Sequence, residues 1–74
     1  MNDYNKYIII DPKVRFGKPI IIGTRISVYD IVNWLANKMT HEDIISDFPE
    51  LTVDKINACL HFVAQRENRV RVAS

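Results

Sequence analysis

The chain has 74 residues, of which 47% are apolar, and its formal net charge is +1. A chain of this length forms one domain near the lower size limit for folding alone, and its single cysteine, Cys59, excludes an internal disulfide. It has no membrane-length apolar run, signal-peptide pattern or metal-ligand spacing, so we expect a cytoplasmic protein without a membrane, metal or cofactor partner.

Two apolar runs near the N-terminus, residues 7–10 and 20–22, predict the strands of a β-hairpin over residues 7–22. Asp11-Pro12 ends the first run with a turn-favouring pair. Both runs are continuously apolar, which predicts that both faces of the ribbon are covered. Three helices can cover one face only, so we expect a second copy on the other. The expected dimer contacts are Ile8, Ile10, Ile20, Ile22 and Trp34.

The next segment changes from strand to helix within a few residues. Gly23 permits a positive φ, and Ser27 is the expected N-cap, with Asp30 completing a shortened capping box. Arg25 has two interpretations. It either pairs with Asp11 or Asp30 and ties down the turn, or it contacts a ligand. The structural pair is favoured because an arginine fork holds a carboxylate and loop carbonyls well.

The first helix is expected from about Val28 to Asn37, with Asn37 as a left-handed cap. Trp34 and Tyr29 fall off its apolar stripe, toward a neighbouring element or a partner chain. The residues expected to be buried on this helix are Val28, Ile31, Val32, Leu35 and Ala36.

Two further helices follow, the first starting at Thr40 and closed by Pro49, the second capped by Thr52 and reaching about Glu67. The apolar side of the first is expected at Ile44, Ile45 and Phe48, and that of the second at Val53, Ile56, Leu60 and Val63, with Cys59 and Ala64 beside it. We therefore predict a mainly α, single-domain fold: the hairpin, a three-helix helix-turn-helix unit over residues 27–67, and a tail over 68–74.

Catalytic chemistry finds little support. His41 and His61 lie on different predicted helices, and no serine or cysteine sits in a nucleophile motif. Cys59 is expected to be a small buried side chain. Acidic residues at the start of the second helix are typical of capping, and a hydrolase using Asp43 and Asp47 is a remote alternative. We expect no catalytic residues.

Charge is segregated along the chain, and this bears on nucleic-acid binding. Residues 41–54 contain five acids and no lysine or arginine. A helix-turn-helix unit reads DNA with its second helix, which here offers Thr52, Lys55 and Asn57 beside acidic neighbours. The alternative surface is the hairpin loop and the turn after it, with Lys13, Arg15, Lys18 and Arg25. Both surfaces stay open, as does a role of the three helices as a scaffold alone.

Three stretches, IIIDPKVRFGKP, GKPIIIGTRISVYDIVNWLA and DIISDFPELTVDKINACLHFV, together resemble the domain-of-unknown-function family 433. That family is similar to VapB-type antitoxins of toxin–antitoxin pairs, and the likeness extends from about Ile8 to Val63. The resemblance implies a homeodomain-like three-helix fold with an N-terminal hairpin, usually dimeric. It also implies DNA binding at the promoter of its own operon and masking of a PIN-like ribonuclease toxin.

The chain departs from this family pattern at two positions. The family tends to have a second glycine before GKP, where this chain has Phe16, and a glycine at the end of the first helix, where it has Lys38. The first departure changes the surface of the hairpin loop, and the second mainly affects cap geometry.

The function expected from these observations is that of a small, non-catalytic DNA-binding regulator resembling a type II antitoxin. Its partners would be a second copy, operator DNA and a PIN-like ribonuclease toxin. The alternative is a protein-interaction module that neutralises a toxin without specific DNA binding, for which the acidic helix pair would supply the contact.

Overall fold

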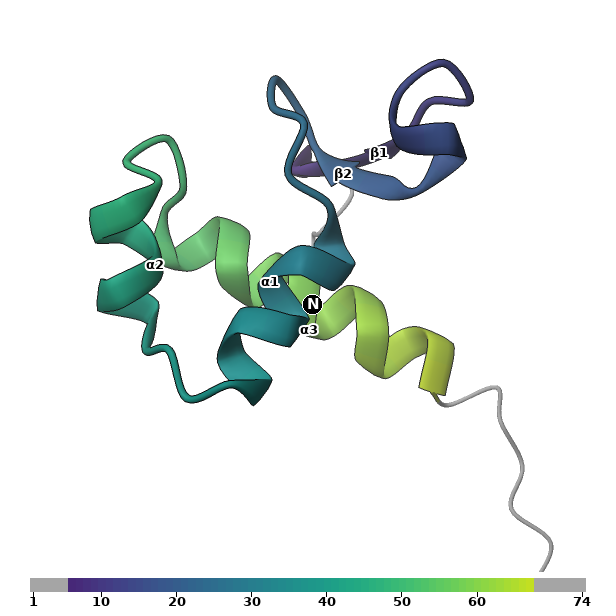
Figure 1. The fold of residues 1–74 in the computed structure, drawn as a ribbon. Helices are drawn as coiled ribbons and strands as arrows, with labels where there is room; N and C mark the ends of the chain where they lie inside the picture. The colour runs from purple at the N-terminus through teal and green to yellow at the C-terminus, as the bar shows by residue number, and fades with distance from the viewer. Residues whose placement is uncertain (1–5, 68–74) are drawn as a thin grey trace, which may run out of the picture.

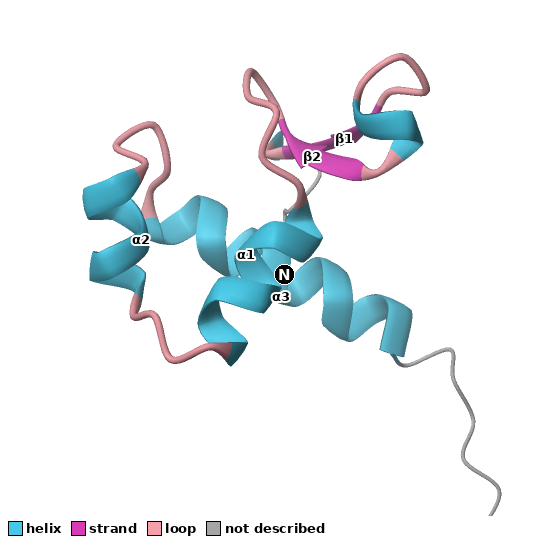
Figure 2. Ribbon diagram, viewed as in Figure 1, coloured by secondary structure: helices cyan, strands magenta, loops and turns pink. Residues whose placement is uncertain are grey.

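The computed structural model describes residues 6–67 and is mainly helical, with a short antiparallel hairpin before three helices (Figure 1). The predicted tail, residues 68–74, lies outside the described residues. Figure 2 colours the same view by secondary structure. The elements in chain order are β1 (Ile8–Ile10), the 3-10 turn η2 (Arg15–Gly17), β2 (Pro19–Ile21), α1 (Val28–Ala36), α2 (His41–Asp47) and α3 (Val53–Glu67).

The two strands confirm the predicted hairpin, and a third segment extends the ribbon. Ile8 pairs with Ile21 and Ile9 with Ile20. On the other edge of β2, the Ile21 N–H donates to the Ile26 carbonyl at 2.9 Å, and Ile20 forms a bridge with Ser27. The chain therefore folds back along β2 before α1 begins, which leaves β1 as the outer strand of the ribbon.

The faces of the hairpin correct part of the expected dimer interface. Ile8 and Ile20 are only 8% and 4% exposed, because their own chain covers them, with Ile8 inside the helical core. They need no second copy. Ile9 and Ile22, by contrast, are each 47% exposed, and Ile10 is also exposed. Of the predicted hairpin contacts, Ile10 and Ile22 remain open to a partner, and Ile9 joins them.

Helix α1 begins as its sequence predicts. The Ser27 hydroxyl accepts from the Asp30 N–H at 3.0 Å, and Asp30 accepts in return from the Ser27 N–H at 3.1 Å, which completes the capping box. Val28 and Ile31 are fully buried, whereas Ala36, expected in the core, is exposed at the end of the helix.

The end of α1 corrects the predicted cap. Lys38 adopts the left-handed conformation, with φ 73°, while Asn37 has φ −94°. The Met39 N–H donates to the Trp34 carbonyl at 3.0 Å and the Lys38 N–H to the Leu35 carbonyl at 3.1 Å. This pair of bonds is a Schellman motif, in which the residue after the C-cap turns left-handed. The motif places that turn one residue later than the sequence suggested.

Helices α2 and α3 pack against α1, which also contacts β2. Ile44 of α2 is buried as predicted. The buried face of α3 is rotated from the predicted stripe: Ile56 and Cys59 are fully buried and Phe62 is nearly so, whereas Val53 and Leu60 are exposed. Only one side of α3 faces the core. The spacing of apolar residues predicts that such a side exists, but it does not decide between two neighbouring apolar stripes.

Trp34 illustrates the packing between α1 and α2. Its ring stacks on that of Phe48, with centroids 4.7 Å apart and planes 7° from parallel. The residue expected at a dimer interface is half-buried and already uses one ring face inside its own chain. No helix within residues 6–67 is long and apolar enough to cross a membrane.

Candidate functional site

The loop between β1 and β2 is a tight, internally bonded turn. A side-chain oxygen of Asp11 accepts from the Lys13 N–H at 2.9 Å, and the Asp11 carbonyl accepts from the Val14 N–H at 2.9 Å. The Gly17 N–H then donates to the Val14 carbonyl at 3.1 Å. These bonds satisfy successive backbone groups, so the turn has a defined shape rather than a loose one.

Three consecutive residues of this turn are left-handed: Arg15 at φ 51°, Phe16 at φ 58° and Gly17 at φ 80°. Glycine adopts such angles without a steric penalty, but a residue with a Cβ pays roughly 1–2 kcal/mol. A bulky aromatic residue is a rare occupant of this region. The backbone at Phe16 is therefore strained, and the surrounding contacts must hold it.

Arg15 supplies those contacts. Its Nη1 donates to the Arg25 carbonyl at 2.7 Å and lies 3.1 Å from Oδ2 of Asp30, forming an ion pair with it. The guanidinium thereby joins the hairpin turn, the turn after β2 and the first turn of α1. The expectation that Arg25 pairs with Asp11 or Asp30 is wrong, because Arg15 occupies that position and Arg25 contributes its backbone carbonyl instead.

Asp30 is the acceptor at the centre of this junction. Partial burial works to raise the pKa of its carboxyl group, but hydrogen bonds from the Ser27 N–H and the Arg15 guanidinium outweigh that effect. The net result is a pKa below its ordinary value of 3.8. Asp30 is thus held in its ionised form, in which it caps α1 and pairs with Arg15 at the same time.

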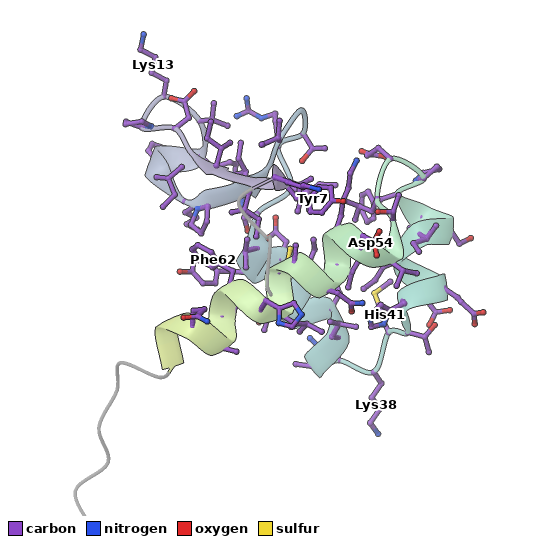
Figure 3. All side chains as sticks on the ribbon, turned by 180° about the vertical axis from the view of Figure 1, so that it is seen from behind. Tyr7, Lys13, Lys38, His41, Asp54 and Phe62 are labelled. Atoms are coloured by element: carbon purple, nitrogen blue, oxygen red, sulfur yellow. The ribbon has the colours of Figure 1, made fainter. Side chains whose placement is uncertain are left out.

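The remaining cations of this region are not engaged. Lys13, Lys18 and Arg25 are exposed, and across residues 6–67 their side chains form no ion pair or hydrogen bond. Figure 3 shows Lys13 extending away from the molecule. Phe16, which lies between them in sequence, is 99% exposed. We call these four residues the basic end.

The candidates on α3 have partners within their own chain. The Lys55 ammonium donates to the Glu50 carbonyl at 2.9 Å, and the Thr52 hydroxyl accepts from the Lys55 N–H at 3.2 Å. Oδ1 of Asn57 lies 3.1 Å from Nε2 of His41 on α2. The structure thus brings these residues together with α2 and not with the basic residues of the hairpin. We call the five acids around them, Glu42, Asp43, Asp47, Glu50 and Asp54, the acidic corner.

The described residues, 6–67, include the cysteine and both histidines of the chain. They contain no group of three or more His, Cys, Asp or Glu side chains that could hold a metal ion. Cys59 is buried, as predicted, and desolvation raises the pKa of its thiol from 9.0 to about 12, which keeps it protonated. His61 is exposed on α3.

Residues 8–63 match the family described as "Protein of unknown function (DUF433)". The chain belongs to this family. The crystal structure of a DUF433 member protein from Anabaena variabilis ATCC 29413 superposes on it with a TM-score of 0.78 at 27% sequence identity. The match covers 84% of this chain and 61% of that one, so the present chain spans less than two thirds of its length. No curated protein matches the chain.

Within this DUF433 chain, the two positions at which the resemblance led us to expect a glycine, Phe16 and Lys38, are both left-handed. That coincidence is the signal that could have located the strained turn from the sequence. Sequence reasoning missed Arg15 as the residue that ties the turn down, and it missed the full exposure of Phe16. The expected glycines point to the backbone conformation, but only the folded chain shows what each side chain does there.

Proposed function

We propose that this chain is a small, non-catalytic DNA-binding regulator of antitoxin type, acting in the cytoplasm as a dimer, and that its basic end contacts phosphate. One observation carries the proposal: Lys13, Lys18 and Arg25 project from adjoining turns with no anionic partner among residues 6–67. Lysine and arginine side chains that neutralise phosphates supply most of the sequence-independent affinity for DNA. The family resemblance to antitoxins supplies the regulatory context.

The basic end is a better phosphate contact than α3. Five carboxylates and no lysine or arginine occur in residues 41–54, immediately before Lys55. Like charge near the phosphates would oppose approach of the acidic corner, and Lys55 and Asn57 already have partners. We propose that α2 and α3 form a homeodomain-like helix-turn-helix scaffold whose task is to hold the hairpin.

The dimer is proposed to form through the outer strand. β1 is the edge of the ribbon, and Ile9, Ile10 and Ile22 are exposed on or beside it. An exposed apolar edge strand invites pairing with another strand. Two copies related by a twofold axis would pair β1 with β1, cover these isoleucines and join two basic ends in one assembly.

A salt-dependent binding assay tests the proposal. The probe is a labelled duplex of the DNA upstream of this chain's own gene, titrated by anisotropy at low and at physiological salt. We expect affinity to fall steeply with salt, and the triple variant Lys13→Gln, Lys18→Gln, Arg25→Gln to bind weakly with a shallower slope, by roughly 0.9 per lost phosphate contact. Lys55→Gln is the matched control and should bind normally. Wild-type binding no stronger than that of an acidic control protein would remove the DNA proposal.

The acidic corner favours a second candidate function, a protein-interaction module that neutralises a PIN-like ribonuclease toxin. A basic ribonuclease surface would complement its carboxylates. Co-purification with the product of the adjacent gene tests this candidate, with Glu42→Lys and Asp47→Lys as the disruptive pair and Lys13→Glu as the control. Capture that survives the Glu42→Lys, Asp47→Lys variant but is lost in Lys13→Glu would place the protein contact at the basic end instead.

A further inference from the structure

Phe16 has no structural reason to be where it is. Its side chain is 99% exposed, so it contributes nothing to the core, and its φ of 58° strains the backbone. A glycine at this position would relieve the strain and remove an apolar ring from water. Phe16 therefore lowers the stability of the chain in two ways, through its strained backbone and through its exposed apolar ring.

Lys38 provides the comparison within the same chain. It is also exposed and left-handed, with φ 73°, but its charged side chain suits water and its backbone completes the Schellman motif. Lys38 lies at the opposite end of the molecule from Lys13 in Figure 3. The two residues share the backbone strain, and only Phe16 adds an exposed aromatic ring to it.

The turn presents this ring on a fixed base. Arg15, the residue directly before it, is held to Arg25 and Asp30, and the Lys18 N–H closes the turn on the Arg15 carbonyl at 3.1 Å. A preorganised turn loses little conformational freedom on binding, so the ring can contribute its contact energy at low entropic cost. Exposed, strained and rigidly supported residues are typical of binding sites.

The cations of the same turn and of the adjoining one indicate the class of ligand. Lys13, Lys18 and Arg25 are unpaired among residues 6–67, whereas Asp30 is paired and Asp11 accepts from the Lys13 N–H. We expect a ligand of this end to carry anionic groups arranged beside an apolar surface. Duplex DNA has that arrangement, with phosphates flanking stacked bases, and apolar side chains inserted from the minor groove are known to open base steps.

We infer that Phe16 is an insertion residue, whose ring enters the base stack of the duplex while the neighbouring cations hold the phosphates on either side. The inference rests on the DNA-binding function proposed above and specifies how the basic end engages its ligand. Insertion unstacks one base step and bends the duplex away from the protein, so the preferred sites should contain flexible pyrimidine–purine steps.

The test uses the same upstream duplex with single adenines replaced by 2-aminopurine, whose fluorescence rises when it is unstacked. Wild-type protein should raise the fluorescence at one step. Phe16→Gly should abolish that rise and weaken binding by roughly tenfold or more, while its melting temperature increases by several degrees. Lys38→Gly is the matched control: it also relieves a left-handed residue and should be stabilised, but it should bind and report as the wild type does.

The outcomes separate this inference from the proposed function. If the wild type binds with steep salt dependence but Phe16→Gly binds equally well and no step brightens, insertion is wrong and the phosphate contact stands. If the wild type does not bind DNA, both are wrong. If Phe16→Gly instead loses capture of the neighbouring gene product, or of vesicles containing anionic lipid, the ring is a protein or membrane anchor, and the inference is overturned.

Discussion

The basic end and the acidic corner differ in how they use their charged groups. At the acidic corner, the Lys55 ammonium is bonded to a backbone carbonyl, His41 contacts Asn57, and Asp43 caps α2. Beside the basic end, Arg15 is paired with Asp30, whereas the exposed side chains of Lys13, Lys18 and Arg25 have no bonded partner within residues 6–67. A net charge of +1 conceals this contrast, because opposite charges gather at different places and cancel only in the sum.

A recognition-helix pattern in the sequence does not ensure that the side chains of that helix are free for a ligand. In the turn and helix most suggestive of DNA reading, Lys55 and Asn57 are committed to internal bonds, and the charged side chains that remain exposed there are acidic. The hairpin turns, which lack any regular motif, offer cations without a bonded partner in residues 6–67. A ligand is attracted to what remains unpaired after folding, and the following predictions test how firmly each end is held by the rest of the chain.

The largest loss of stability should come from weakening the contact between the hairpin, which carries most of the basic end, and the helical core. Ile21 of β2 is fully buried against the helices, and truncation to alanine should reduce the free energy of unfolding by about 2–5 kcal/mol. Ile22→Ala, one residue on and exposed, should change it by less than about 0.5 kcal/mol. Urea unfolding followed by circular dichroism measures both. Equal losses would mean that the hairpin is not part of the core.

The next largest effect is the loss of stability when a capping box is broken, and the two boxes should differ in its size. Ser27 is buried and Thr40 is exposed, although each accepts from the third residue of its helix at 3.0 Å. Ser27→Ala should cost about 1–2 kcal/mol, since it removes the acceptor of the part-buried Asp30 N–H, and Thr40→Ala about 0.5–1 kcal/mol. Urea midpoints of the two variants give the comparison. A larger loss at Thr40 would contradict the closer coupling of the first box to the hairpin.

A smaller effect is expected at the tie between the hairpin turn and α1. Arg15→Met removes a partly exposed ion pair and one hydrogen bond to a carbonyl, and should cost about 1 kcal/mol. Lys18→Met, in the same loop but unpaired, is the control and should be close to neutral. Thermal unfolding measures the melting temperatures of both variants. Equal melting temperatures would contradict a stabilising role of the Arg15 ion pair.

The smallest effect concerns pH. Because the pKa of Asp30 is lowered on folding, its ionised form stabilises the native state above the ordinary value of 3.8, and this contribution disappears as pH falls through that value and then through the folded pKa. The stability difference between wild type and Arg15→Met should therefore narrow on acidification. Urea titrations at about pH 6 and at a pH well below 3.8 measure it. A constant difference would show that the ion pair contributes nothing.

Much of the fold was predictable because its signals are local. Asp11-Pro12, Ser27 with Asp30, and Thr40 with Asp43 each fix a turn or a helix start within three residues of sequence. The structure has its strands and helices close to where these signals place them. The glycine at position 23 likewise has the positive φ, 83°, that its place between strand and helix suggested.

The candidate site was less predictable, because it depends on which turns meet. Sequence reasoning named all four cations of the hairpin region but assigned the ion pair to Arg25, whereas Arg15 forms it. Nothing in the local sequence distinguishes these two arginines. The choice is made by the left-handed turn, which carries the Arg15 guanidinium back to Asp30.

The sequence by itself determined the short-range structure of this chain: where strands end, where helices begin, and where Gly23 turns the backbone left-handed. Tertiary structure alone decided which face of α3 is buried, that Ile8 and Ile20 need no second copy, and which cations stay unpaired. The physical reason is range. Caps and turns are bonds between near neighbours in sequence, whereas burial and ion pairing depend on distances between segments that only the completed fold brings together.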